Sequence, residues 1–255
     1  MLNWFRPTCP VDRAAKVWIE ERLEWLSKEF PQSAFTGKPV ILPTAEFFPD
    51  RYEPSEDAVR ALLDRVCGYM GVSPSVVELK LISQVGKVWL VNESGKYLPQ
   101  AAGTYEEGHS QFVVRIDKSG LDDPMSLVGT IAHELAHVRL MGEGRVDGDI
   151  FDNELLTDLT VVFHGLGIFL ANSPRVWESQ FTKWPGTNLN KTEYMSPPMF
   201  GYALAHMAWF QKESRPVWAK HLHGGARANL KQGIRYLLST GDSAYYPPHY
   251  RPDSL

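Results

Sequence analysis

Two histidines four residues apart, with a glutamate directly after the first, are the part of this chain best suited to chemistry. They are His133, Glu134 and His137, in the stretch TIAHELAHV. Residues four apart lie on one face of a helix, so two imidazole rings at this spacing can hold one metal ion together. Glu134 lies one position further round the helix, beside the metal but outside its ligand set. Its carboxylate can therefore take a proton from a zinc-activated water and deliver it to a leaving amine.

Two histidines and a water leave zinc one protein ligand short, and an acidic segment downstream can supply that ligand. The segment DNELLTD contains Glu154 and Asp158, which are again four apart and share one helical face. The connection MGEGRVDGDIF has three glycines, so the chain can turn back on itself. We therefore expect Glu154 to lie beside His137, and Asp158 to accept the free ring N–H of His133.

Glu154 is preferred over the neighbouring aspartates because of its position. Asp147 and Asp149 belong to the glycine-containing connection, where the backbone is poorly fixed. Asp152 is expected to begin the next helix and to act as its cap. Glu154 has a longer side chain on a rigid first turn. The alternative interpretation of these acids is a capped, solvent-exposed helix start without a metal. The corresponding interpretation of the two histidines is an ordinary surface helix.

The motif HExxH followed by NExxTD resembles the motif pair of the gluzincin metallopeptidases, of the thermolysin and M1 aminopeptidase type. The resemblance covers about residues 124–172, and the short interval between the two motifs implies a compact variant. By this resemblance the metal ligands are His133, His137 and Glu154, the general base is Glu134, and the residue that supports a histidine is Asp158.

Hydrophobic periodicity predicts the elements that surround this motif. Apolar residues from Ile19 to Phe30 form one helical stripe, and a second stripe runs from Val59 to Met70 behind Ser55, a suitable helix cap. Strands are expected at VVELKLI, KVWLVN, AAGTY and QFVVRI, with EEGHS as either a hairpin loop or a longer crossing.

The remaining segments are expected to be helical. The HExxH helix should begin at the sequence DDP, and one continuous helix should run from near Asp152 to Ala171. We therefore predict an α+β, zincin-like fold, in which a small mixed β-sheet packs on the HExxH helix. The predicted parts are an N-terminal helical region at 1–72, a catalytic core at 73–172, and a mainly helical C-terminal part at 173–255 that closes a cleft.

Composition narrows the class of function. The net charge of -4 and the lack of a long basic run argue against nucleic acid as a partner. No apolar run is long enough to span a membrane, and the N-terminus has no signal-peptide pattern, so we expect a cytoplasmic protein. Cys9 and Cys67 are isolated, which favours two reduced thiols over a single disulfide. No GxSxG, P-loop or GxGxxG motif is present.

A peptidase of this type needs a hydrogen-bond donor for the tetrahedral oxyanion in addition to its metal. We expect that donor in the C-terminal helices, whose candidates are Tyr194, Tyr202, His206, His221 and His223. The stretch HGLG at 164–167 is expected at a close helix contact and not at the metal.

These features together predict a zinc-dependent metallopeptidase, with Zn²⁺ as cofactor and a peptide or protein as substrate. Two alternatives stay open. One is a zincin-like zinc-binding regulatory or interaction protein without proteolytic turnover, and the other is a helical protein that binds no metal. The sequence specifies neither the cleavage preference nor the oligomeric state.

Overall fold

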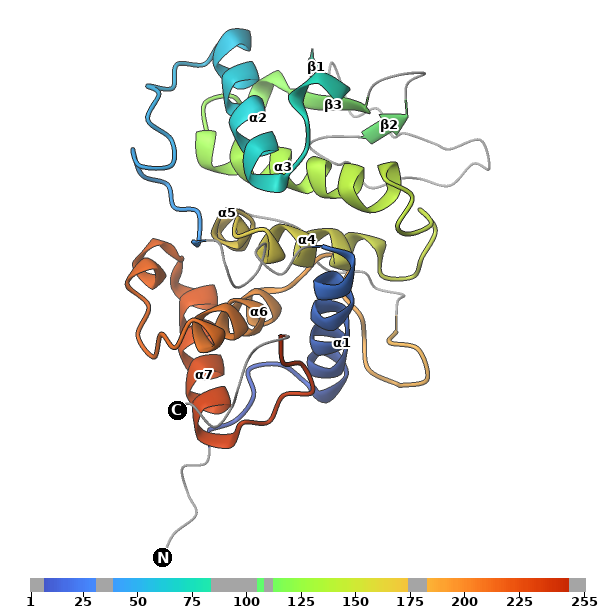
Figure 1. Ribbon diagram of the computed structural model, residues 1–255, viewed down its shortest axis with the longest axis vertical. Helices are drawn as coiled ribbons and strands as arrows, with labels where there is room; N and C mark the ends of the chain where they lie inside the picture. The colour runs from blue at the N-terminus through green and yellow to red at the C-terminus, as the bar shows by residue number, and fades with distance from the viewer. Residues whose placement is uncertain (1–6, 31–38, 84–104, 108–111, 174–182, 248–255) are drawn as a thin grey trace, which may run out of the picture. The chain divides into compact units, whose positions relative to one another are not determined.

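The computed structural model describes residues 7–30, 39–83, 105–107, 112–173 and 183–247 (Figure 1). By its internal contacts the chain divides into two compact units. One unit consists of residues 1–48 together with residues 148–255, and the other consists of residues 49–147. The helix near the N-terminus thus belongs to the same unit as the helices of the C-terminal part.

The unit of residues 49–147 combines two helices with a small sheet. Its elements are α2 (Glu56–Met70), a 3-10 turn (Pro74–Val76), β1 (Val77–Ile82), β2 (Tyr105–Glu107), β3 (Phe112–Asp117), a second 3-10 turn (Lys118–Gly120), α3 (Pro124–His137) and a π-helical turn (Val138–Gly142). The strand order is β1-β3-β2, with β3 parallel to β1 and antiparallel to β2. The sheet is therefore mixed. It packs on the HExxH helix, because α3 contacts β3 as well as α2.

The described residues cover only part of the segment EEGHS. β2 pairs antiparallel with β3, with Tyr105 opposite Val114. Glu106 and Glu107, the first two residues of EEGHS, therefore belong to β2 itself, and residues 108–111 lie outside the described part of the chain. The strand predicted at KVWLVN, residues 87–92, also lies outside the described residues.

Local capping signals begin both helices of this unit where the sequence predicts. The Ser55 hydroxyl accepts the backbone N–H of Ala58 at 3.2 Å, at the start of α2. Asp123 accepts two backbone N–H groups in the first turn of α3, each at 3.1 Å. Such bonds satisfy amide groups that a helix cannot pair internally. The position of the HExxH motif within α3 is thus set by a cap ten residues earlier in the chain.

The regular elements described in the unit of residues 1–48 and 148–255 are helices. Its elements are α1 (Arg13–Glu29), α4 (Asn153–Phe163), α5 (Gly167–Asn172), α6 (Pro197–Phe210), a 3-10 turn (Val217–His221) and α7 (Gly224–Thr240). The apolar stripe of α1 is fully buried at Ile19, Leu23 and Leu26, as predicted. α4 contacts α1, α5 and α6. Among the described residues, every helix is too short or too polar to span a lipid bilayer.

Two glycines allow α6 and α7 to approach closely. A Cβ atom on Gly201 would lie 2.5 Å from Cβ of Asn229, and one on Gly233 would lie 2.8 Å from Cβ of Ala205. Neither separation is tolerated between real carbon atoms, so larger residues would push the two helices apart.

The prediction of one continuous helix over 152–171 was wrong. The helix is broken after Phe163, where Gly165 adopts a φ of 88°. The backbone N–H of Ile41 donates to the Gly165 carbonyl oxygen at 2.9 Å, and a Cβ on Gly165 would lie 2.9 Å from the Pro39 carbonyl oxygen. The segment around residues 39–41 therefore packs against a backbone that only glycine adopts readily.

Candidate metal centre

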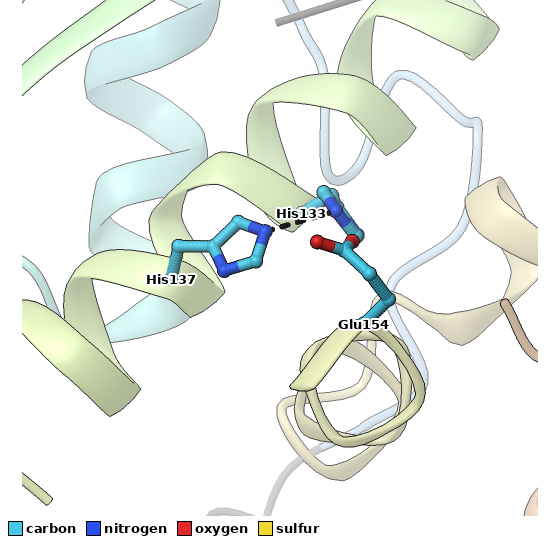
Figure 2. Close-up of side chains that lie close together, drawn as sticks. All are labelled: His133, His137 and Glu154. Carbon is cyan, nitrogen blue, oxygen red and sulfur yellow. Dashed lines mark hydrogen bonds between the residues drawn. The ribbon is translucent and has the colours of Figure 1, made fainter. Parts of the chain in front are cut away.

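α3 places the two histidines of the HExxH motif against each other. Their Nε2 atoms are 3.2 Å apart, and their rings meet edge to face with centroids 4.8 Å apart (Figure 2). His133 is 5% exposed and His137 is 7% exposed, so both rings are removed from bulk water. The i, i+4 spacing accounts for this arrangement, because it aims both rings at one point beside the helix.

Glu154, in the first turn of α4, is the third member of the group. One ligand atom from each of His133, His137 and Glu154 lies within 4.8 Å of the other two (Figure 2). The group therefore joins two imidazole nitrogens to one carboxylate oxygen. Among the acids considered from the sequence, Asp147 and Asp149 are exposed in the connection that precedes α4, and neither belongs to this group.

The donor set fits a zinc ion. With zinc–nitrogen bonds of about 2.0–2.1 Å, two ligands at the tetrahedral angle lie about 3.3 Å apart. The Nε2 atoms of His133 and His137 are separated by 3.2 Å, which is close to that value. Two imidazoles with one carboxylate are also a ligand set that catalytic zinc sites use, with the fourth position open.

Glu134 and Asp158 are both buried polar residues. Glu134 is 3% exposed and directly follows His133 in α3. Asp158 is fully buried in α4, where its Oδ2 accepts the backbone N–H of Met195 at 3.0 Å. This bond ties the segment before α6 to α4, one turn after Glu154. The expected contact between Asp158 and a histidine stays a prediction.

Asp152 lies at the start of the helix as predicted, but the predicted capping contact was wrong. Asp152 is the residue that precedes α4, but its side chain makes no capping bond to that helix. Its carboxylate is fully buried and accepts from Nε1 of Trp18 at 2.7 Å and from two guanidinium nitrogens of Arg22 at 2.7 and 2.9 Å. A paired guanidinium is a stronger partner than a backbone amide, which explains the different contact. Through it α1 holds the start of the helix that carries Glu154.

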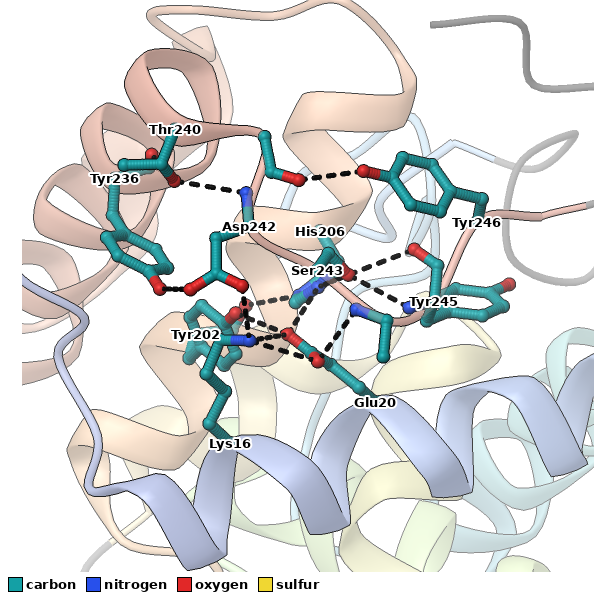
Figure 3. Close-up of polar contacts among 12 residues, drawn as sticks. Lys16, Glu20, Tyr202, His206, Tyr236, Thr240, Asp242, Ser243, Tyr245 and Tyr246 are labelled. Atoms are coloured by element: carbon teal, nitrogen blue, oxygen red, sulfur yellow. Dashed lines mark hydrogen bonds and ion pairs between the residues drawn. The ribbon is translucent and has the colours of Figure 1, made fainter.

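Two of the predicted oxyanion donors belong to a separate buried network (Figure 3). The Tyr202 hydroxyl donates to Glu20 at 2.7 Å, and Lys16 forms an ion pair with the same carboxylate at 3.1 Å. His206 Nδ1 lies 3.1 Å from the Tyr202 carbonyl oxygen, and its Nε2 lies 3.2 Å from the Ser243 hydroxyl. Burial lowers the pKa of His206 to about 4, against an opposing effect of the Glu20 carboxylate. The Tyr202 side chain therefore joins α6 to α1, and that of His206 joins α6 to the segment after α7.

The other three donor candidates differ in exposure. Tyr194 and His221 are half-buried, whereas His223 is exposed at the start of α7. Asn172 binds the backbone of both histidines, since it donates to the His221 carbonyl oxygen at 2.7 Å and accepts the His223 N–H at 2.8 Å. These contacts fix the chain and leave the roles of the three side chains as predictions.

One buried cation was missed by sequence reasoning. Lys191 is 3% exposed, and the carboxylates whose charge acts on it include Asp152 and Glu154. In the sequence it is an ordinary lysine within the polar stretch NLNKTEY, and no spacing signal distinguishes it. Only the three-dimensional structure shows that it lies near the start of α4.

Cysteine chemistry has no support in the structure. Cys9 and Cys67 are both free thiols, as favoured from the sequence. Burial raises the pKa of Cys67 to about 12, which keeps this thiol protonated and a poor nucleophile.

Comparisons with known proteins add no relative. No protein-family model matches the chain, and no match was found among curated proteins or among solved structures.

Proposed function

We propose that this chain is a zincin-like, zinc-dependent metallopeptidase. The observation that carries the proposal is the convergence of His133, His137 and Glu154, with Glu134 buried directly beside the first of them. The convergence supports a metal site, and the resemblance to the gluzincin motif pair supports the assignment of roles within it. These three residues are the proposed ligands and Glu134 is the proposed general base.

The chain's own residues divide the chemistry between them. Zinc, when bound, supplies a Lewis acid that polarises the scissile carbonyl and makes a nearby water more acidic. The Glu134 carboxylate takes a proton from the attacking water and returns it to the leaving nitrogen when the peptide bond breaks. The low exposure of Glu134 limits exchange of that proton with bulk water.

Asp158 is proposed to support His133. A carboxylate offers about four acceptor positions, and the N–H of Met195 uses one of them. A ring N–H bound at another of these positions would keep the opposite ring nitrogen unprotonated and directed at the metal.

The proposal is tested by metal content and turnover measured on the same preparation. Elemental analysis with anomalous scattering at the zinc edge should show one zinc per chain, held by His133, His137 and Glu154. The loaded protein should then cleave members of a peptide library at internal or terminal bonds. Zinc without any turnover would replace the peptidase with a zinc-binding regulatory protein. A protein that binds no metal would overturn both.

A further inference from the structure

Lys191 is a buried ammonium with few partners. Its Nζ donates to the Thr192 carbonyl oxygen at 3.3 Å, and this is its one hydrogen-bond acceptor among the described residues. An ammonium group carries three N–H donors. Burying such a cation is unfavourable unless opposite charge or further acceptors compensate it. The structure therefore contains a cation with unused capacity to bind an anion.

The segment that carries this lysine is fixed at both ends. At one end the Trp184 ring packs on Trp18, with centroids 5.8 Å apart, and Trp18 itself binds Asp152. At the other end the N–H of Met195 binds Asp158. The two anchoring aspartates flank Glu154 in sequence. A backbone bridge between residues 183 and 190 adds rigidity to the segment.

Two of the three carboxylates that act on the charge of Lys191 have other roles. The positive charge of Lys191 is attracted by the carboxylates of Glu193, Asp152 and Glu154. Asp152 is already matched by two guanidinium nitrogens of Arg22. Glu154 is a proposed metal ligand, and no ion pair among the described residues includes Lys191. Burial is the main reason that the pKa of Lys191 is lowered, as expected for a cation without a direct counter-ion.

We propose that Lys191 binds a carboxylate group of the peptide substrate, on the Glu154 side of the proposed metal centre. This inference rests on the proposed peptidase function and adds a substrate preference to it. An ammonium–carboxylate contact is charge-assisted, and a neutral amide in the same place leaves the buried cation uncompensated. The carboxylate can come from an Asp or Glu side chain or from the C-terminus of the peptide.

Four matched pools of acetylated octapeptides separate these sources. The pools contain either acidic side chains or their amides, each with a free or an amidated C-terminus. Binding is measured by equilibrium dialysis against zinc-loaded Glu134→Gln protein, so that the readout does not depend on turnover. We expect about 10–100-fold tighter binding of one carboxylate-bearing pool than of the pool without carboxylates. A preference for acidic side chains or for free C-termini identifies the source.

Three further variants in the same background assign the preference to Lys191. Lys191→Met should abolish it and Lys191→Arg should retain most of it, since only the second keeps the charge. Lys183→Met is the matched control, because Lys183 is exposed in the same segment and should not affect the preference. If Lys191→Met does not fold, the pool comparison and the arginine variant still decide.

The possible results separate this inference from the proposed function. Equal binding of all four pools, no binding, or a preference that survives in Lys191→Met would overturn the role of Lys191. Wild-type turnover on the same pools would leave the peptidase proposal intact in each of these cases. A carboxylate preference that depends on Lys191, in a protein that cleaves nothing, would keep the binding role and reject the peptidase.

Discussion

Two polar clusters of this protein differ in how their groups match one another. Around Glu20 the groups are complementary, because its carboxylate accepts from the Tyr202 hydroxyl and from the backbone N–H of Ala244, beside the Lys16 ammonium (Figure 3). The cluster of His133, His137 and Glu154 instead joins three groups that all offer electron pairs to a cation (Figure 2).

The kinds of groups in each cluster say more about its role than their burial does. Both clusters contain buried side chains, although Glu154 itself is half-buried, and both include a histidine and a glutamate. Complementary donors and acceptors stabilise a fold without any ligand. Groups that share one role are typical of sites that hold a metal. We therefore assign a structural role to the Glu20 cluster and propose chemistry only for the other.

The largest effect is expected from Glu134→Gln. The variant should keep its fold and its zinc but lose turnover by roughly 10²–10⁴-fold or more, because it lacks the proton acceptor while every proposed ligand is retained. Steady-state rates and metal content measured together test this, with Glu56→Gln as an exposed control in the same unit. Loss of zinc, or full activity, would show that Glu134 has another role.

The next largest effect concerns the carboxylate ligand. Glu154→Ala should weaken zinc binding by more than the roughly 10–100-fold typical of residues that only support a ligand. Asp149→Ala, in the exposed connection, should leave the affinity unchanged. Competition titrations with a chelator measure both. The reverse order of effects would remove Glu154 from the ligand set and with it the gluzincin assignment.

A smaller loss of affinity is expected from Asp158→Asn. The amide keeps the size of the side chain, but it removes the charge that would orient a histidine ring, so zinc affinity or activity should fall about 10–100-fold. The thermal stability of the metal-free variant serves as the control, because the bond to Met195 contributes to folding as well. Unchanged affinity together with unchanged rate would limit Asp158 to a structural role.

The smallest effect lies in the structural cluster and depends on pH. The pKa of His206 is lowered to about 4 in the folded protein, below its ordinary value near 6.5, so folding favours the neutral ring. The contribution of the neutral His206 ring to the free energy of unfolding is fully present above about pH 6.5, and it is lost as the pH falls toward 4. The loss should reach about 2 kcal/mol by pH 5. It reflects burial, with Glu20 opposing the shift and Lys16 adding to it.

Urea unfolding of the metal-free protein across this pH range measures the effect. His206→Asn should lower the stability at neutral pH and reduce its dependence on acid. His223→Asn, at an exposed position, should leave the pH dependence unchanged. Equal acid sensitivity of His206→Asn and the wild type would show that His206 is not the group responsible.

The sequence by itself determined the features that depend on neighbours along the chain. The caps at Ser55 and Asp123 act over two or three residues, and the cap at Ser55 and the helix start at DDP were predicted correctly. The spacing of His133 and His137 sets their convergence, because one helical turn brings residues four apart together. The mixed sheet and the helical C-terminal part also followed from periodicity and turn signals.

The tertiary structure decided the features that depend on residues far away in the chain. The break at Gly165 exists because residues near Ile41 pack against it, and Asp152 binds Arg22, which is 130 residues earlier. The burial of Lys191 arises in the same way, from a segment anchored on α1 and α4. Spacing along the chain does not encode such contacts, because their energies depend on which distant surfaces meet after folding.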